Sequence, residues 1–245
     1  MNTVGGAARL AVAVMLLTAV CGAISFVSGG DPMLAPELAS ASFIAAWLVH
    51  VVRAACGALV HSRRLSVRSK PASIGGTTVW IIPDPVPVAC VSGLLRPRIY
   101  LSASLLDMLD DGELRGVLLH ESHHRATLAP FRSLVLDAWQ RTAGWLPPVR
   151  RALLARLATL EIEADAAAVA AGVRPATLAS ALLKCDPDPD AYAAASAFST
   201  AAEVRIGELL AWGRAERTEF RPSLPLEWAA PAAAAALLAC HVVGV

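Results

Sequence analysis

The sequence predicts a mostly α-helical protein with a small β-sheet, anchored in a membrane by flanking transmembrane helices. Hydrophobic residues make up 56% of the 245 residues and charged residues only 17%, whereas an average soluble domain has about 45–50% apolar and about 25% charged residues. The apolar excess is concentrated near the two ends of the chain. The more polar middle shows helical spacing of apolar residues and only short β-branched runs.

Two nearly uncharged stretches near the N-terminus are long enough to cross a bilayer, which takes about 20 apolar residues. We predict transmembrane helices over residues 8–28 and 38–61. The segment after the second stretch is basic, with Arg63, Arg64, Arg68 and Lys70. Because positive charge favours the cytoplasmic side, we expect a multi-pass protein of the inner membrane whose central domain is cytoplasmic.

Two further apolar segments lie in the second half of the chain. Residues 228–245 carry no charge and just suffice for a third transmembrane helix. Their alanines and Pro231 leave an interfacial or buried helix as the alternative. Residues 128–149 contain three charged residues at about one-turn intervals: Arg132, Asp137 and Arg141. A charge at mid-bilayer costs at least about 2.5–3.5 kcal/mol. We therefore predict that 128–149 is a helix packed on the domain or lying in the interface, ended by Pro147 and Pro148.

The middle of the chain, residues 65–225, is predicted to be one folded domain. Short β-branched runs at 77–82 and 98–102 predict strands. Asp110 or Asp111 can cap a helix that begins near Glu113. The other helices expected in this domain cover 104–111, 150–171, 175–184 and 191–216.

The helix after the predicted cap carries the pattern H-E-x-x-H at residues 120–124. Residues four apart share a helix face, so His120 and His124 can bind one Zn²⁺ at about 2.0–2.1 Å. Glu121 can then act as the general base of a hydrolytic reaction. His123 offers an alternative pair with His120, but the central glutamate favours His120 and His124.

A second acidic cluster follows in the helix predicted over 150–171. A catalytic zinc takes three protein ligands and leaves one position for water. Glu161 or Glu163 could be the third ligand, and they cannot both serve because residues two apart point to different helix faces. Asp165 shares a face with Glu161 and could orient a ligand histidine through a hydrogen bond.

Cysteine content and net charge narrow the function classes. The five cysteines form no C-x-x-C pair, which argues against a cysteine-type zinc site and a disulfide scaffold. The net charge of +1 gives no global field for nucleic acid. We therefore expect no direct nucleic-acid partner.

Three stretches of this chain resemble the integral-membrane gluzincin peptidases, over roughly residues 75–172. They are DPVPVACVSGLLRPRIYLS, LLDMLDDGELRGVLLHESHHR and EIEADAAAVAAG. The sequence is most similar to the BlaR/MecR-type antirepressor family, and the HtpX and CAAX prenyl protease families share H-E-x-x-H and E-x-x-x-D. The resemblance implies a zincin-like (gluzincin) domain with Zn²⁺ as cofactor, His120, His124 and Glu161 as ligands and Glu121 as the base. The family aspartate falls on Asp165.

The resemblance also implies an activity. It predicts an integral-membrane zinc endopeptidase that cuts a protein substrate near the inner membrane face, for example a transcriptional repressor, with membrane lipid as a second partner. We expect no penicillin-binding sensor domain after the last predicted span, and therefore no function as a β-lactam receptor. The single charged apolar helix between the two motifs favours the antirepressor type over the HtpX type. An HtpX-like quality-control protease, a catalytically silent membrane sensor or scaffold, and a transporter-like protein without bound zinc are the alternatives.

Overall fold

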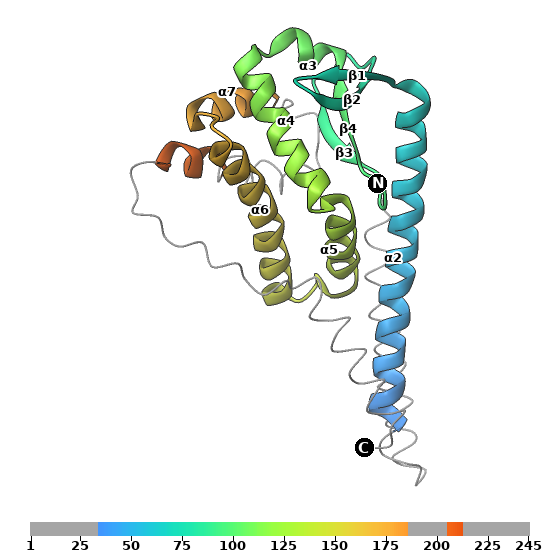
Figure 1. The fold of residues 1–245 in the computed structure, drawn as a ribbon. Coiled ribbons are helices and arrows are strands. Elements are labelled where there is room, and N and C mark those ends of the chain that lie inside the picture. Colours follow the sequence, from blue (N-terminus) through green and yellow to red (C-terminus); the bar gives the residue numbers. More distant parts are fainter. Residues whose placement is uncertain (1–33, 186–204, 213–245) are drawn as a thin grey trace. The chain divides into compact units, whose positions relative to one another are not determined.

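The computed structural model describes residues 34–185 and 205–212 (Figure 1). The chain divides into two compact units. The first comprises Met1–Cys56, Leu134–Leu153 and Pro222–Val245, and the second comprises Gly57–Ser133 and Leu154–Arg221. The transmembrane helices predicted over 8–28 and 228–245, and most of the helix predicted over 191–216, lie outside the described residues.

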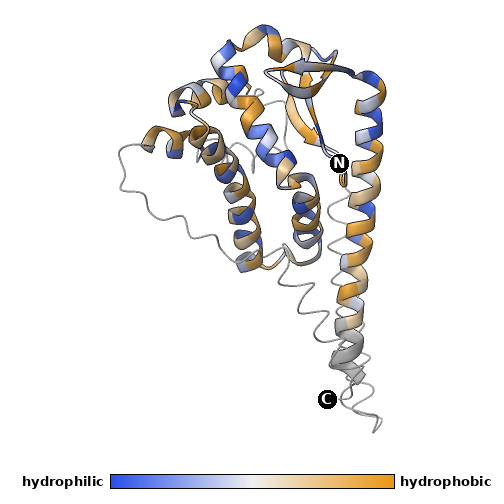
Figure 2. Cartoon of the chain, viewed as in Figure 1, coloured by the Kyte–Doolittle hydropathy of each residue, from blue (hydrophilic) through white to orange (hydrophobic). Residues whose placement is uncertain are grey.

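Helix α2 (Leu34–Arg68) contains the stretch predicted as the second span. Its portion Ala41–Arg68, coloured by hydropathy in Figure 2, is the one helix among the described residues that is long and apolar enough to cross a membrane. None of its most apolar window is buried. Its C-terminal end carries the exposed residues Arg63, Arg64 and Arg68. The prediction of a helix over 38–61 is confirmed.

The β-sheet of the second unit has four strands in the order β1-β2-β4-β3. They are β1 (Lys70–Ile74), β2 (Thr77–Ile82), β3 (Ala89–Ser92) and β4 (Arg98–Ser102). Strands β2 and β4 are parallel, and the two outer pairings are antiparallel. The predicted strands at 77–82 and 98–102 are confirmed as the central pair. The two strands that were not predicted are the edges, where a proline such as Pro71 is tolerated.

The two faces of the sheet have different neighbours. Val79, Ile99 and Leu101 are fully buried and form a hydrophobic cluster with helices α3 (Ala103–Met108) and α4 (Asp111–Ala126). On the opposite face the Tyr100 hydroxyl lies 3.1 Å from the Ser66 Oγ of α2, within hydrogen-bond distance. The sheet therefore connects the end of α2 to the helix that carries H-E-x-x-H.

Helix α4 begins with a reciprocal cap. The Asp110 carboxylate accepts a hydrogen bond from the backbone N–H of Glu113 at 2.8 Å, and the Glu113 carboxylate accepts one from the N–H of Asp110 at 3.0 Å. These bonds satisfy two N–H groups that a helix start would otherwise leave unpaired. The sequence left Asp110 and Asp111 open as the cap, and the structure has Asp110; the helix begins at Asp111, two residues before the predicted start near Glu113.

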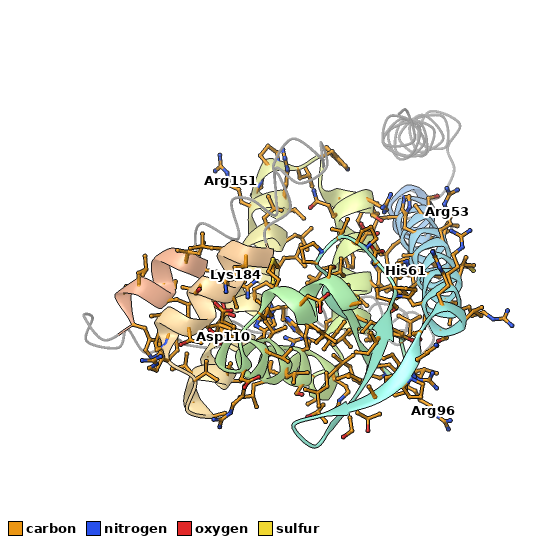
Figure 3. The ribbon with its side chains drawn as sticks, turned by 90° about the horizontal axis from the view of Figure 1, so that it is seen from above. Arg53, His61, Arg96, Asp110, Arg151 and Lys184 are labelled. Carbon is orange, nitrogen blue, oxygen red and sulfur yellow. The ribbon has the colours of Figure 1, made fainter. Side chains whose placement is uncertain are left out.

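The same glutamate ties α4 to helix α7 (Pro175–Cys185). Glu113 is buried, and its carboxylate accepts hydrogen bonds from the Lys184 Nζ at 2.6 Å and the Ser180 Oγ at 2.7 Å. Figure 3 shows Lys184 beside Asp110 at this end of α4. The N-terminal end of α4 is therefore held both by its own cap at Asp110 and by Ser180 and Lys184 of α7.

We expect Glu113→Ala to lower the free energy of unfolding by about 1–3 kcal/mol, because a charged hydrogen-bond acceptor is lost and three donors, the Asp110 N–H, Ser180 and Lys184, are left without it. Thermal unfolding of the purified full chain in detergent measures the effect. The matched control is Asp111→Asn, an exposed change in the same helical turn. Equal unfolding temperatures for Glu113→Ala and the control would show that the hydrogen bonds of Glu113 do not stabilise α4.

The segment predicted over 128–149 is helical, but its predicted end is wrong. Helix α5 (Ala129–Ala143) ends before Gly144. Pro147 begins helix α6 (Pro147–Ala170) and does not end the preceding one. Proline is tolerated in the first turn of a helix, where its missing N–H would have no intrahelical partner.

The part of α5 that belongs to the first unit packs against α2. The ring of Trp139 lies 5.3 Å from that of Trp47 and 6.0 Å from that of Phe43, measured between centroids. At 15 residues, α5 is shorter than the about 20 residues that a bilayer crossing takes.

Candidate metal centre

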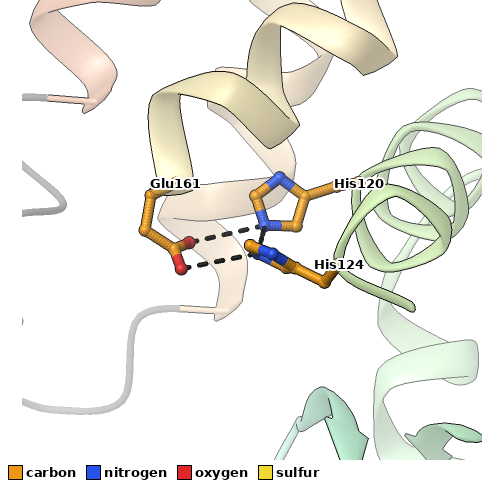
Figure 4. A group of neighbouring side chains, drawn as sticks. All are labelled: His120, His124 and Glu161. Atoms are coloured by element: carbon orange, nitrogen blue, oxygen red, sulfur yellow. Dashed lines mark hydrogen bonds and ion pairs between the residues drawn. The ribbon is translucent and has the colours of Figure 1, made fainter. Parts of the chain in front are cut away.

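Two histidines of α4 and one glutamate of α6 converge on one point (Figure 4). The Nε2 atoms of His120 and His124 are 2.9 Å apart. Each also lies 3.4 Å from a different carboxylate oxygen of Glu161. Among the described residues these three form the group that could hold a metal ion.

The spacing of these atoms suits a tetrahedral zinc site. Ligand atoms about 2.0–2.1 Å from a zinc ion at tetrahedral angles lie about 3.3 Å from one another. The two Nε2-to-carboxylate distances of 3.4 Å match this separation, and the Nε2–Nε2 distance of 2.9 Å is slightly shorter. The donor set of two imidazoles and a carboxylate is also the set found in some catalytic zinc sites with an open position for water.

Asp165 fixes the tautomer of the His120 ring. Its Oδ1 atom lies 2.8 Å from the Nδ1 of His120, and both side chains are buried. A carboxylate only accepts hydrogen bonds, so Nδ1 of His120 carries the hydrogen. The lone pair of the neutral ring is then on Nε2, which faces His124 and Glu161. The contact that the sequence suggested for Asp165 is present, and it is the arrangement that orients metal-binding histidines.

Arg205 completes the cluster and was not predicted from the sequence. It lies in a short helical segment at 205–211. Its guanidinium binds both oxygens of Asp165, at 2.7 and 2.8 Å, and lies 3.1 Å from an oxygen of Glu161. One arginine therefore holds the metal-facing carboxylate and the carboxylate that orients His120.

The sequence offers one indirect signal for Arg205. Three acids near one another in a buried site, Glu121, Glu161 and Asp165, need a nearby cation because buried carboxylates without a partner are strongly unfavourable. This argument calls for a cation, but it does not say which basic residue supplies it. Arg205 is 40 residues from Asp165 in the chain, and no spacing rule links the two.

Negative charge dominates the electrostatics of the cluster. Burial alone would lower the pKa of His120, but its hydrogen bonds to Asp165 and Glu161 outweigh burial and raise the pKa to about 9. Burial would raise the pKa of Glu161, but the hydrogen bonds from His120 and His124 and the charge of Arg205 hold it well below its usual range. The cluster thus favours a cation at its centre, which fits a divalent metal ion.

Glu121 is buried beside the histidines and has different surroundings from Glu161. Burial raises the pKa of the Glu121 carboxyl, and the positive charges of His120 and His124 only partly oppose the effect. A raised carboxyl pKa brings a general base closer to the pH at which it works. The position and environment of Glu121 are therefore suited to accepting a proton.

The two alternatives from the sequence are placed elsewhere. Glu163 lies 3.1 Å from the guanidinium of Arg156 and 3.8 Å from that of Arg132, outside the group that could hold a metal. The ring of His123 is half-buried, with its centroid 6.5 Å from that of His124. Of the two candidate acids, the structure brings Glu161 to the histidines.

Glu161 is the most exposed of the three candidate ligands. The side chain of Glu161 is 34% exposed, whereas those of His120 and His124 are 8% and 11% exposed. A catalytic zinc site keeps one position for water, and the exposed side of Glu161 is where water can reach the candidate centre.

No family model, curated protein or solved structure matches the chain.

We expect the purified full chain to bind about one zinc ion, and His124→Ala to lose it, because two ligands hold zinc far more weakly than three. Metal analysis after dialysis against buffer with a weak chelator measures the stoichiometry. The matched control is His123→Ala, one residue away on the same helix, which should keep the metal. Equal zinc content in both variants would rule out the proposed ligand set.

Proposed function

We propose that this protein is a membrane-anchored zinc endopeptidase with His120, His124 and Glu161 as zinc ligands. The observation that carries the proposal is the convergence of two imidazole nitrogens and a carboxylate at distances suited to tetrahedral zinc, with Glu121 buried beside them. The H-E-x-x-H spacing on one helix is the arrangement that zinc peptidases use.

In the proposed peptide hydrolysis, each residue of the centre has a separate role. When bound, zinc supplies a Lewis acid that polarises a carbonyl oxygen and lowers the pKa of water. Glu121 takes a proton from the attacking water and delivers it to the leaving nitrogen. Asp165 keeps the hydrogen of His120 on Nδ1, and Arg205 holds Asp165 and Glu161 in place. Because Glu161 is the most exposed of the three ligands, we propose that substrate enters on its side.

An extended segment of the substrate would pair with strand β3. Among the described strands, β3 is an edge strand with β4 on one side only, and it packs against α4, the helix of the two histidines. An open strand edge presents unpaired N–H and C=O groups that an extended peptide can bind. The other edge strand, β1, has no comparable packing against α4. Substrate residues would therefore be recognised beside the metal centre.

The proposed location is the inner membrane, with the metal centre on the cytoplasmic side. Support comes from the apolar, unburied stretch of α2 and from the exposed arginines at its C-terminal end, because basic residues favour the cytoplasmic side. A substrate near this face, for example a repressor or another regulatory protein, is the class that the resemblance implies.

Comparative proteomics tests this function in cells. We expect cells with Glu121→Gln to accumulate at least one intact protein that cells with the unsubstituted chain convert to fragments. A chain with His120→Ala should give the same accumulation, because it loses a zinc ligand. Identical sets of intact proteins and fragments in all three strains would contradict proteolysis as the function.

A further inference from the structure

The turn between β3 and β4, residues 93–97, is tightly built. Gly93 has φ of +114°, and a Cβ atom at this position would lie 2.9 Å from the carbonyl oxygen of Arg96. A side chain at 93 would therefore clash with the backbone of the turn, so the turn depends on glycine at this position. Leu95 lies at its tip and is 89% exposed, the highest value among large hydrophobic residues in the described part of the chain.

The flanks of this turn are basic and aromatic. Arg96 and Arg98 are exposed, and the Arg98 guanidinium lies 4.7 Å from the centroid of the Trp80 ring. Figure 3 shows Arg96 pointing outward at the periphery of the molecule. A projecting leucine with arginine and tryptophan around it is the composition of segments that lie at a membrane interface.

The turn lies in the same compact unit as the basic C-terminal end of α2. Strand β4 leads directly into α3 at Ser102, so the turn lies at the opposite end of the strand. Between these ends, Tyr100 is bonded to Ser66 near the C-terminus of α2. Tyr100 therefore links the strand that carries the turn to the end of α2 where Arg63 and Arg64 are exposed.

We propose that the 93–97 turn is a second membrane contact, separate from the crossing by α2. Leu95 enters the boundary between headgroups and acyl chains, and Arg96, with Arg63 and Arg64 of α2, binds anionic headgroups. The partner is thus an anionic bilayer. The inference rests on the proposed crossing by α2 and does not depend on the peptidase reaction. The contact of the 93–97 turn with the bilayer would hold the open edge of β3 close to the membrane surface.

Photo-crosslinking of the full chain in vesicles tests the contact. The residue p-benzoylphenylalanine replaces Leu95, and adducts are identified by mass spectrometry after irradiation. We expect lipid adducts at 95, at least about threefold more abundant in vesicles of phosphatidylcholine with phosphatidylglycerol than in phosphatidylcholine alone. The matched control is the same replacement at Val86, 42% exposed and located before β3 at the other end of the sheet, which should give few lipid adducts.

A third position separates this inference from the proposed anchoring. The replacement at Leu48, an exposed residue of α2, reports on the bilayer crossing itself. Lipid adducts at 48 without adducts at 95 would overturn the second contact and leave the crossing intact. No lipid adducts at 48 would overturn the crossing and the second contact together. Adducts of 95 with protein in place of lipid would make the turn a protein-docking site and also overturn the proposal.

A double substitution of arginines tests the recognition of anionic headgroups. Arg96→Glu combined with Arg64→Glu should reduce the adducts at 95 in anionic vesicles toward the level seen with phosphatidylcholine alone. Unchanged adducts in the double variant would contradict the recognition of anionic headgroups.

Discussion

Replacing Glu121 by glutamine is expected to slow peptide hydrolysis roughly 10²–10⁴-fold, the range typical for loss of a general base, while zinc stays bound. Glutamine has nearly the same size as glutamate but cannot accept the proton. Glu121 is also absent from the group that could hold the metal, so the metal ligands are untouched. The buried site should tolerate the change, because the substitution removes a buried charge.

The measurement is the initial rate of cleavage of an unfolded protein substrate by the purified full chain, together with its zinc content. The matched control is Ser122→Ala, the next residue on α4, which should keep both activity and metal. Cleavage at an undiminished rate by Glu121→Gln would remove Glu121 from the mechanism. A loss of zinc along with activity would instead make Glu121 a residue that holds the metal site together.

The second large effect is expected for Arg205→Met, which leaves the carboxylates of Asp165 and Glu161 without their shared cation. Breaking such a buried pair typically costs about 3–5 kcal/mol of unfolding free energy. The loss of a group that orients ligands through hydrogen bonds typically weakens metal binding about 10–100-fold. Arg205→Lys should show a smaller loss, because lysine keeps the charge but cannot bind both carboxylates in the same planar geometry.

Competition with a fluorescent zinc chelator measures the affinity, and chemical denaturation measures the stability. Glu208→Gln, an exposed change in the same short helix, is the matched control. If Arg205→Met does not fold, the affinity of Arg205→Lys still decides the question. Zinc affinity equal to that of the control in each variant that folds would mean that Arg205 plays no part in positioning the ligands.

Those parts of the fold that depend on local sequence rules could be predicted. The cap at Asp110, the strand of β-branched residues at 77–82 and the proline-led helix α7 each follow from chemistry within a few neighbouring residues. The edge strands β1 and β3 were missed because their pairing depends on distant partners. The end of the helix predicted over 128–149 was misplaced because Pro147 is compatible with both stopping one helix and starting the next.

The candidate metal centre also has residues that local sequence rules predict and residues that they do not. The spacing of His120 and His124 predicts a shared helix face, since four residues make about one turn. The choice of Glu161 over Glu163 could not be made from local spacing alone, because either can face the histidines depending on how α6 is rotated. Arg205 was beyond sequence reasoning altogether, as its position depends on where a later segment packs against the centre.

The contact of Arg205 also bears on how fragments of this protein should be designed. A fragment that ends after α7 would contain both sequence motifs and the whole sheet, yet it would leave Asp165 and Glu161 without their guanidinium partner. Such a fragment would be an unsuitable sample for assays, and a negative result obtained with it would say nothing about the protein. The smallest portion worth purifying therefore extends past Trp212, well beyond the last residue of either motif.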